Sequence, residues 1–169
     1  MRDNLIQPEF PAQEAVRAYG ALSFLYARSP RHADWPVSRL RLIMQPPIDL
    51  RQASVFLYDG VPRAACTWAH LSDEAQARLV AGDPITPSQW HSGPHLWLME
   101  IIAPYGQGSG GRALRAFMRG IPEKIPCFRY LRIGKDNEIR KIVEIRRGLN
   151  KGWNAPVFSQ TLEGLGNGN

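Results

Sequence analysis

Two side chains have types and surroundings that suit proton transfer. His32 lies in the polar segment 28–36, where two prolines exclude regular structure and favour an ordered loop. A neutral imidazole accepts protons near neutral pH, and Asp34 is close enough in sequence to orient the ring. Glu100 lies within the apolar run 96–103, where an acid is uncommon unless it is paired or functional. We interpret both as candidates for acid–base chemistry; the alternatives are an ordinary loop histidine and a structural carboxylate.

A glycine-rich segment, 104–111, follows the apolar run and leads into a basic helical pattern. Backbone N–H groups at a helix N-terminus bind anions, and glycine lets a phosphate approach closely. The segment is not a nucleotide-triphosphate loop, because neither Lys-Ser nor Lys-Thr follows the glycines. It fits a phosphate or a phosphopantetheine arm, and the alternative is a turn without a ligand. The candidate residues for binding an acyl donor are Gln107, Gly108, Ser109, Gly110, Gly111, Arg112, Arg115 and Arg119.

The other reactive side chains do not indicate a metal or disulfide site. His70, His91 and His95 lack the spacing of a metal-ligand set, so no metal is expected. Cys66 and Cys127 each lie in an apolar, strand-like run, which predicts reduced cysteines in the core.

Composition and charge limit the class of protein. The 169 residues, 44% of them hydrophobic, are typical of one globular domain and exclude wholesale disorder. The apolar runs are too short to span a membrane, and no secretion signal is seen, so we expect a cytoplasmic protein. The net charge of +6 is concentrated after residue 111, which predicts a basic face that attracts an acidic partner. Nucleic acid is not expected, because the tryptophans are not interleaved with the arginines.

Periodicity predicts the elements that must position these residues. Helices are expected at 11–27, 37–44, 72–82 and 112–119, and strands at 53–58, 63–69, 96–103, 128–133 and 139–147. Asp59-Gly60 predicts a hairpin turn, and Pro46-Pro47 is expected to end the second helix. Residues 1–10 are expected to form a loose arm. This order predicts a mixed α/β fold.

Four blocks, in this order, resemble the RTX-toxin-activating lysine acyltransferases. They read SPRHADWPV (29–37), VPRAACTWA (61–69), WHSG (90–93) and WLMEIIAPYG (97–106). The most specific parts are Ser-Pro-x-His-x-x-Trp-Pro-Val and the ending Ile-Ala-Pro-aromatic. The resemblance covers residues 21–148.

The resemblance implies a fold similar to the GNAT acetyltransferases, with a mixed, mostly antiparallel central sheet flanked by helices. It implies one acyltransferase domain, expected at 1–148, and usually a homodimer. Residues 149–169 are rich in glycine and asparagine, which by itself predicts a flexible tail. The implied reaction moves a fatty acyl group from acyl carrier protein to internal lysines of an RTX protoxin. The donor is a phosphopantetheine thioester, and no permanently bound cofactor is implied.

The resemblance matches His32 to the family's required histidine and Glu100 to a required acid that is typically Asp. We interpret His32 as the base and Glu100 as the group that orients the imidazole or the incoming amine. The glycine-rich segment is richer in glycine than expected of the family, which leaves acyl-CoA open as the carrier. The alternatives are a GNAT-type N-acyltransferase that uses acyl-CoA on a small amine, and a basic adaptor without catalysis.

Overall fold

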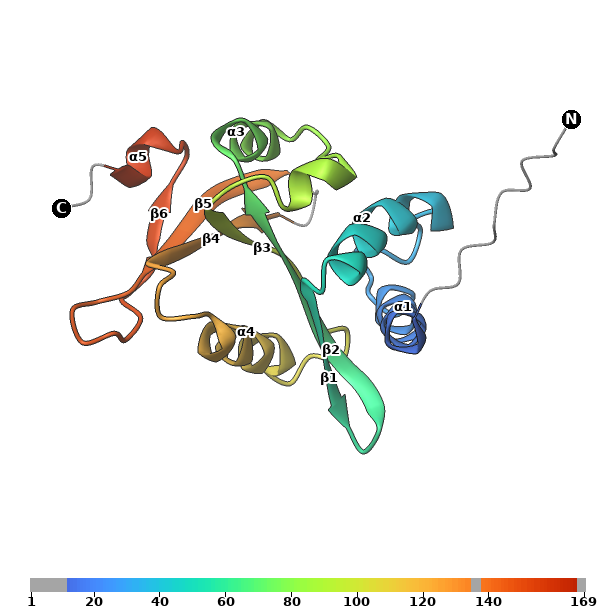
Figure 1. The fold of residues 1–169 in the computed structure, drawn as a ribbon. Helices are drawn as coiled ribbons and strands as arrows, with labels where there is room; N and C mark the ends of the chain where they lie inside the picture. Colours follow the sequence, from blue (N-terminus) through green and yellow to red (C-terminus); the bar gives the residue numbers. More distant parts are fainter. Residues whose placement is uncertain (1–11, 135–137, 167–169) are drawn as a thin grey trace, which may run out of the picture.

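The computed structural model describes residues 12–134 and 138–166 (Figure 1). Its strands are β1 (Ala53–Tyr58), β2 (Val61–Leu71), β3 (His95–Ile102), β4 (Cys127–Ile133), β5 (Ile139–Arg146) and β6 (Val157–Ser159). Its helices are α1 (Gln13–Tyr26), α2 (Val37–Asp49), α3 (Asp73–Ala81), α4 (Ser109–Gly120) and α5 (Glu163–Gly166), with a 3-10 turn η1 (Pro87–Trp90). The strands form one six-stranded sheet in sequence order, antiparallel except for the parallel pair β3–β4. The predicted mixed, mostly antiparallel α/β fold is confirmed.

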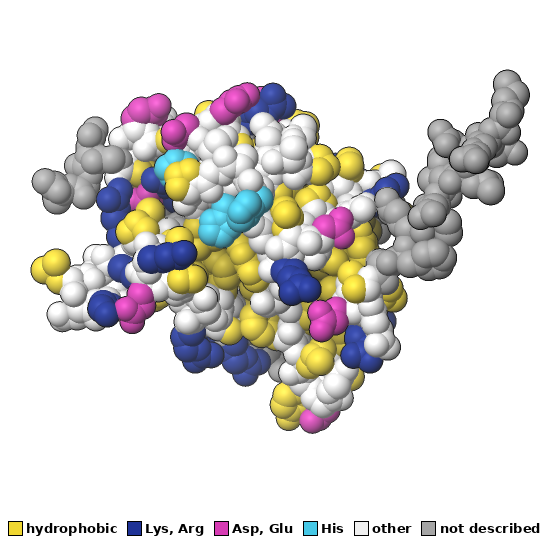
Figure 2. Space-filling model, in the orientation of Figure 1, with side chains coloured by type: hydrophobic (Ala, Val, Ile, Leu, Met, Phe, Trp, Pro, Cys, Tyr) yellow, Lys and Arg dark blue, Asp and Glu magenta, His cyan; other side chains and the backbone are white. Residues whose placement is uncertain are grey.

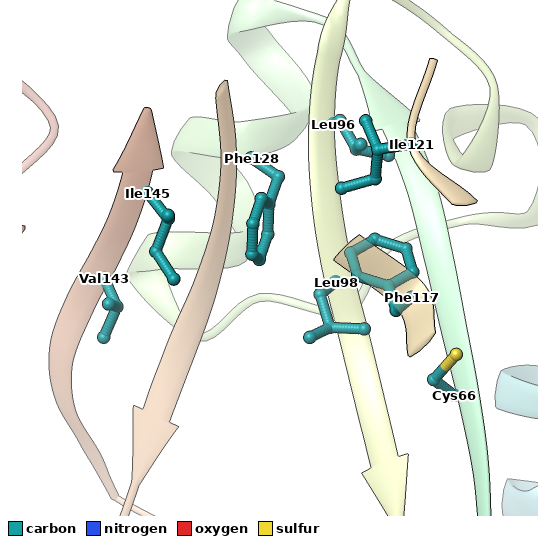
Figure 3. Close-up of a cluster of buried hydrophobic side chains, with 8 residues drawn as sticks. All are labelled: Cys66, Leu96, Leu98, Phe117, Ile121, Phe128, Val143 and Ile145. Carbon is teal, nitrogen blue, oxygen red and sulfur yellow. The ribbon is translucent and has the colours of Figure 1, made fainter. Parts of the chain in front are cut away.

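Helices cover both faces of the sheet. Helix α4 packs on one face, where Phe117 meets Leu98 and Phe128 (Figure 3). Helices α1 and α2 pack on the opposite face, over Ala65 and Ile102. Helix α3 covers the same face further along the strands, around Trp97. We refer below to the α4 face and the α1–α2 face.

The hairpin between β1 and β2 forms at the predicted turn. Asp59 and Gly60 both have positive φ, 50° and 75°, as a two-residue turn that follows the strand twist requires. The turn leaves Leu57 and Tyr58 on an exposed tip.

Helix α2 corrects one prediction. It was expected to end before Pro46-Pro47, but it runs through both prolines to Asp49. A proline lacks the N–H for an intrahelical bond, so each one weakens the helix. Met44, both prolines and Ile48 are buried in this last turn, and their burial offsets the lost bonds.

The expected flexible tail at 149–169 is a second correction. Strand β6 pairs with β5 along Val157–Ser159. Leu165 in α5 is 2% exposed and packs with Trp97 and Ile142. The packed part of the domain therefore extends beyond Gly148, because this segment adds an apolar side chain to the buried cluster under α3. Residues 167–169, like the expected arm at 1–10, lie outside the described residues.

Both cysteines are free thiols; Cys66 is buried in the core, as predicted, whereas Cys127 is only half-buried. Burial raises the pKa of Cys66 to about 12. At neutral pH the Cys66 thiol is therefore protonated and a poor nucleophile.

A charged cluster centred on Glu144 joins strands β4 and β5 to helix α3. Glu144 is fully buried and accepts hydrogen bonds from Arg129 Nε, at 2.7 Å, and from Arg146 Nε. Arg129 also donates to Gln76 Oε1 of α3 at 2.7 Å. The cluster ties α3 to the central strands.

Replacing Glu144 with glutamine is expected to destabilise the protein by about 3 kcal/mol, because two arginines lose a buried counter-charge. For a domain of this size, this lowers the thermal midpoint by about 10 °C. Calorimetry checks the shift, and Glu123→Gln, which removes an exposed ion pair with Lys151, is the control. A Glu144→Gln midpoint equal to that of the control would contradict the prediction.

Within the described residues, no helix has both the length and the apolar character needed to cross a membrane.

Candidate active site

A β-bulge in β3 determines which face Glu100 occupies. Thr67 of β2 pairs with Glu100, but the next residue, Trp68, pairs with Leu98, so Met99 has no partner on β2. Strict alternation would have placed Glu100 beside Leu98 on the α4 face. The extra residue instead turns Glu100 to the α1–α2 face, together with Ile102.

His32 reaches the same face from the predicted loop after α1. The loop is a tight turn in which the His32 and Ala33 N–H groups both donate to the Ser29 carbonyl at 2.9 Å. Although the loop is polar, His32 is only 3% exposed. Its Nε2 lies 3.4 Å from Glu100 Oε1, so the structure brings the two candidate residues together.

The orientation of the imidazole is fixed by groups other than Glu100. Ser29 Oγ lies 2.7 Å from His32 Nδ1 and within hydrogen-bond distance. The rings of Tyr26 and Trp35 contact the imidazole edge-on, with centroids 4.8 and 4.7 Å away. Asp34, the residue considered for this role, is exposed and has no described contact with His32. Glu100 instead faces the other ring nitrogen, Nε2.

Arg31 contacts the acid from the solvent side. Its Nη1 lies 3.1 Å from Glu100 Oε1, and its side chain is 38% exposed whereas that of Glu100 is 12% exposed. The cation and the imidazole therefore both approach the same carboxylate oxygen, Oε1.

The sequence pattern did not mark Ser29 or Tyr26 as parts of the site. Ser29 could have been found from its place three residues before His32 in a turn, a spacing that brings side chains together. Tyr26 follows the helical spacing of α1, which indicates a core residue, and its side chain is buried.

The glycine-rich segment forms a groove with the β1–β2 hairpin. Its backbone has positive φ at Gly106, Gln107 and Gly108, and α4 begins at Ser109. The groove has a volume of about 700 Å³. Its polar lining includes Gln107, Ser109, Arg112, Arg119 and Arg63, and its apolar lining includes Phe56, Leu57, Tyr58, Ala113 and Ala116.

The structure thus brings together four of the eight candidate donor residues. Gly108 lies in the left-handed region directly before α4, and Gly110 packs towards Ala103. Neither glycine lines the groove, and nor do Gly111 and Arg115. Arg115 is exposed on α4, and dark-blue basic side chains gather in Figure 2 where Figure 1 draws this helix. A mixed lining of this kind suits a ligand with an anionic and an apolar part.

The groove and the His32–Glu100 pair lie on opposite faces of β2 and β3. Ala64 lines the groove, whereas its neighbour Ala65 packs under α1 and α2. Strands β3 and β4 pair only at Trp97–Arg129 and Leu98–Tyr130. Beyond these pairs the strands diverge towards their carboxyl ends, as Figure 3 shows. The divergence leaves the β4 side of β3 without a strand partner next to Glu100.

The other histidines lie away from this pair. The rings of His70 and His91 meet edge-on with centroids 5.4 Å apart, and burial together with His91 lowers the pKa of His70. His95 Nε2 lies 2.8 Å from Asp73 Oδ1. Within 12–134 and 138–166, no group of three or more His, Cys, Asp or Glu side chains could hold a metal ion.

The family model and the similar curated proteins are all acyltransferases. Residues 11–146 match the RTX toxin acyltransferase family. The RTX-I toxin-activating lysine-acyltransferase ApxIC of Actinobacillus pleuropneumoniae is 34% identical over 83% of this chain and 81% of its own length. Protein-lysine myristoyltransferase HlyC of Escherichia coli is 32% identical over 83% and 82%. Protein-lysine palmitoyltransferase CyaC of Bordetella bronchiseptica is 29% identical over 76% and 69%.

Two solved structures are similar at a lower level. The GphF GNAT-like decarboxylase, in complex with isobutyryl-CoA, has a TM-score of 0.45 and 22% identity, and the match covers 70% of this chain and 64% of that one. The loading GNATL domain of CurA from Lyngbya majuscula has a TM-score of 0.45 and 15% identity, over 76% and 65%. In both cases the match spans less than two thirds of the other chain.

Proposed function

This chain belongs to the RTX toxin acyltransferase family, and on that premise we propose that it transfers a fatty acyl group from acyl carrier protein to internal lysines of an RTX-type protoxin, which activates the toxin. The observation that carries the proposal is the 3.4 Å approach of His32 Nε2 to Glu100 Oε1 on the α1–α2 face. At this separation the imidazole can accept a proton from an amine while the carboxylate binds the same amine.

The chemistry assigns each residue a step. A lysine ammonium loses one proton to His32 Nε2, and the resulting amine attacks the thioester carbonyl carbon. The C–N bond forms and the C–S bond breaks. The nitrogen's second proton goes to the departing thiolate, and the imidazolium releases the first to solvent. Glu100 holds the ammonium beside His32 and stabilises the positive charge that forms on the ring.

Ser29 supports this role for His32. If Nδ1–H donates to Ser29 Oγ, 2.7 Å away, the lone pair lies on Nε2, which faces Glu100. The packing of Tyr26 and Trp35 against the ring holds it in this orientation.

The donor is proposed to bind on the α4 face. The phosphate of its phosphopantetheine arm meets Gln107, Ser109 and the N-terminus of α4 in the groove. The arm then passes the end of β3 and enters where β3 and β4 diverge. Glu100 lies three residues before Ala103, which is about 10 Å along a strand.

The basic face after residue 111 supports acyl carrier protein, an acidic protein, as the carrier. Acyl-CoA is the alternative carrier, because it brings a phosphopantetheine phosphate of the same chemistry to the same groove. Family membership argues against a basic adaptor without catalysis. The proposal also includes a cytoplasmic homodimer, which rests on the resemblance of the four sequence blocks.

The test is transfer in vitro. Purified protein is incubated with a protoxin and either acyl-acyl carrier protein or acyl-CoA, and modified lysines are located by mass spectrometry. Acylated internal lysines with the carrier-protein donor support the proposal. Transfer only from acyl-CoA to a small amine would overturn it in favour of the second enzyme class.

Charge reversal on α4 is expected to separate the two donors. Changing Arg115 on α4 and Lys124 just after it, both exposed and outside the groove lining, to glutamate should raise KM for acyl-acyl carrier protein about tenfold or more, because like charges oppose docking. KM for acyl-CoA should change much less, because CoA lacks the acidic protein surface. The matched control reverses Arg17 and Arg51, which are exposed on the α1–α2 side. Equal effects of the two double variants would rule out α4 as the carrier-protein surface.

A further inference from the structure

Four buried polar atoms without a hydrogen-bond partner lie in the His32–Glu100 pair and on the residues beside it. Six buried side-chain polar atoms have no hydrogen-bond partner in the described part of the chain, and four of these are Tyr26 Oη, His32 Nε2, Thr67 Oγ1 and Glu100 Oε2. Tyr26, Thr67 and His32 are 0%, 1% and 3% exposed. Buried polar groups are normally paired, so a cluster without partners needs an explanation.

Thr67 and Tyr26 approach the pair from two further elements. Thr67 is directly opposite Glu100 in the β2–β3 register, so the two side chains lie next to each other on the α1–α2 face. Tyr26 packs against the His32 ring from the last turn of α1. Burial and the negative charge of Glu100 raise the pKa of Tyr26 well above its ordinary value, so its hydroxyl is protonated and neutral.

We propose that these four atoms bind the ε-ammonium group of the acceptor lysine, so that the Thr67 and Tyr26 hydroxyls are lysine-binding groups. This inference rests on the function proposed above. An ammonium group carries three N–H donors and accepts no hydrogen bond. The cluster offers it a carboxylate oxygen, an imidazole nitrogen and two hydroxyl oxygens. An anionic ligand would be repelled by Glu100.

Arg31 indicates the side from which the lysine enters. Its guanidinium already contacts Glu100 Oε1 at 3.1 Å, which shows that this carboxylate accommodates a cation. Oε2 is the oxygen without a partner. Since Arg31 is the more exposed member of the ion pair, the lysine enters beside it and takes Oε2.

The binding site is tested by removing each hydroxyl while keeping the shape of its side chain. Thr67→Val and Tyr26→Phe should each raise KM for the lysine acceptor about five- to thirtyfold, while kcat and KM for the donor change less than about threefold. Their thermal midpoints should stay the same or rise, because each variant removes a buried hydroxyl that has no partner. Thr86→Val, which removes a threonine hydroxyl on an exposed segment, is the control and should leave the acceptor KM unchanged.

A second measurement does not depend on transfer. In the wild-type protein n-butylammonium should inhibit competitively against the acceptor, and by NMR titration it should shift the His32 ring signals without any donor. n-Butanol, which has the same chain without the charge, should do neither. Both hydroxyl variants should bind n-butylammonium about five- to thirtyfold more weakly than the wild type.

The outcomes separate this inference from the proposed function. If the wild type acylates lysine but both hydroxyl variants keep the wild-type acceptor KM, the lysine-binding role of the hydroxyls is wrong and the function stands. A lower thermal midpoint with unchanged KM would show a structural role instead. If the wild type acylates no lysine, the proposed function fails, whereas n-butylammonium binding that is weakened in both variants would still support an ammonium site.

Discussion

Replacing His32 with alanine or asparagine is expected to lower kcat for acyl transfer about a hundredfold or more, because neither side chain accepts a proton from the lysine. Asparagine keeps a polar group between Tyr26 and Trp35, so it separates the loss of the base from the loss of packing. Single-turnover transfer, followed by mass spectrometry of the acceptor, measures the change. KM for the donor should change little, because the groove lies on the other face of the sheet.

The control for this change is His91→Ala, which removes an imidazole that contacts Gln52 and His70 and lies outside the site. Its transfer rate should match that of the wild type. Addition of free imidazole to the His32→Ala protein should restore part of the rate, because a soluble base can enter the space left by the ring. A His32→Asn protein that folds and transfers at the wild-type rate would show that another group removes the proton.

The two central residues of the site could be predicted because each is unusual where it stands. A histidine in a proline-bracketed loop and an acid in an apolar strand can both be recognised without a structure. The contact between them depends on a β-bulge at Met99, and the sequence around Met99 does not predict a bulge. Alternation along β3 predicts the wrong face for Glu100, and only the pairing with β2 shows which face it occupies.

Other parts of the site depend on contacts between distant segments. Tyr26 follows the same periodicity as the core residues of α1, so its polar end could not be distinguished from its apolar ring. Thr67 lies in an apolar strand, and its place beside Glu100 follows from register. The groove on the α4 face requires the β1–β2 hairpin, which supplies five of its thirteen lining residues, and the spacing of the glycines does not indicate this.

Contacts between distant segments also explain why two predictions about the fold were wrong. Prolines usually end a helix because of local sterics, but in α2 the burial of Pro46 and Pro47 under tertiary contacts outweighs that local cost. The segment after Gly148 is rich in glycine and asparagine, which is typical of a tail. Its few apolar residues, Leu165 among them, still complete a core whose other members come from β2, β3, β5, α3 and η1.

Glu100→Gln is expected to lower kcat/KM for the lysine acceptor about a hundredfold, because an amide neither attracts the ammonium nor stabilises the imidazolium that forms beside it. Glu100→Asp keeps the negative charge and introduces the residue that is typical of the family at this position. In this chain the shorter side chain should widen the 3.4 Å approach to His32 Nε2, so a smaller loss of about tenfold is expected. Steady-state kinetics with a lysine peptide measure both variants.

Arg31 provides the means to separate catalysis from stability in this experiment. Glu100→Gln removes the carboxylate that the Arg31 guanidinium contacts at 3.1 Å, so the loss of this ion pair contributes to its effect. The double variant Arg31→Leu with Glu100→Gln removes both charges, and it should recover any lost thermal stability while staying about a hundredfold less active. If the double variant instead regains transfer, the carboxylate serves to neutralise Arg31, and its assignment to the lysine amine is wrong. The order of activity Glu, Asp, Gln at position 100, unchanged by the loss of Arg31, is the pattern that an acid acting on the amine requires.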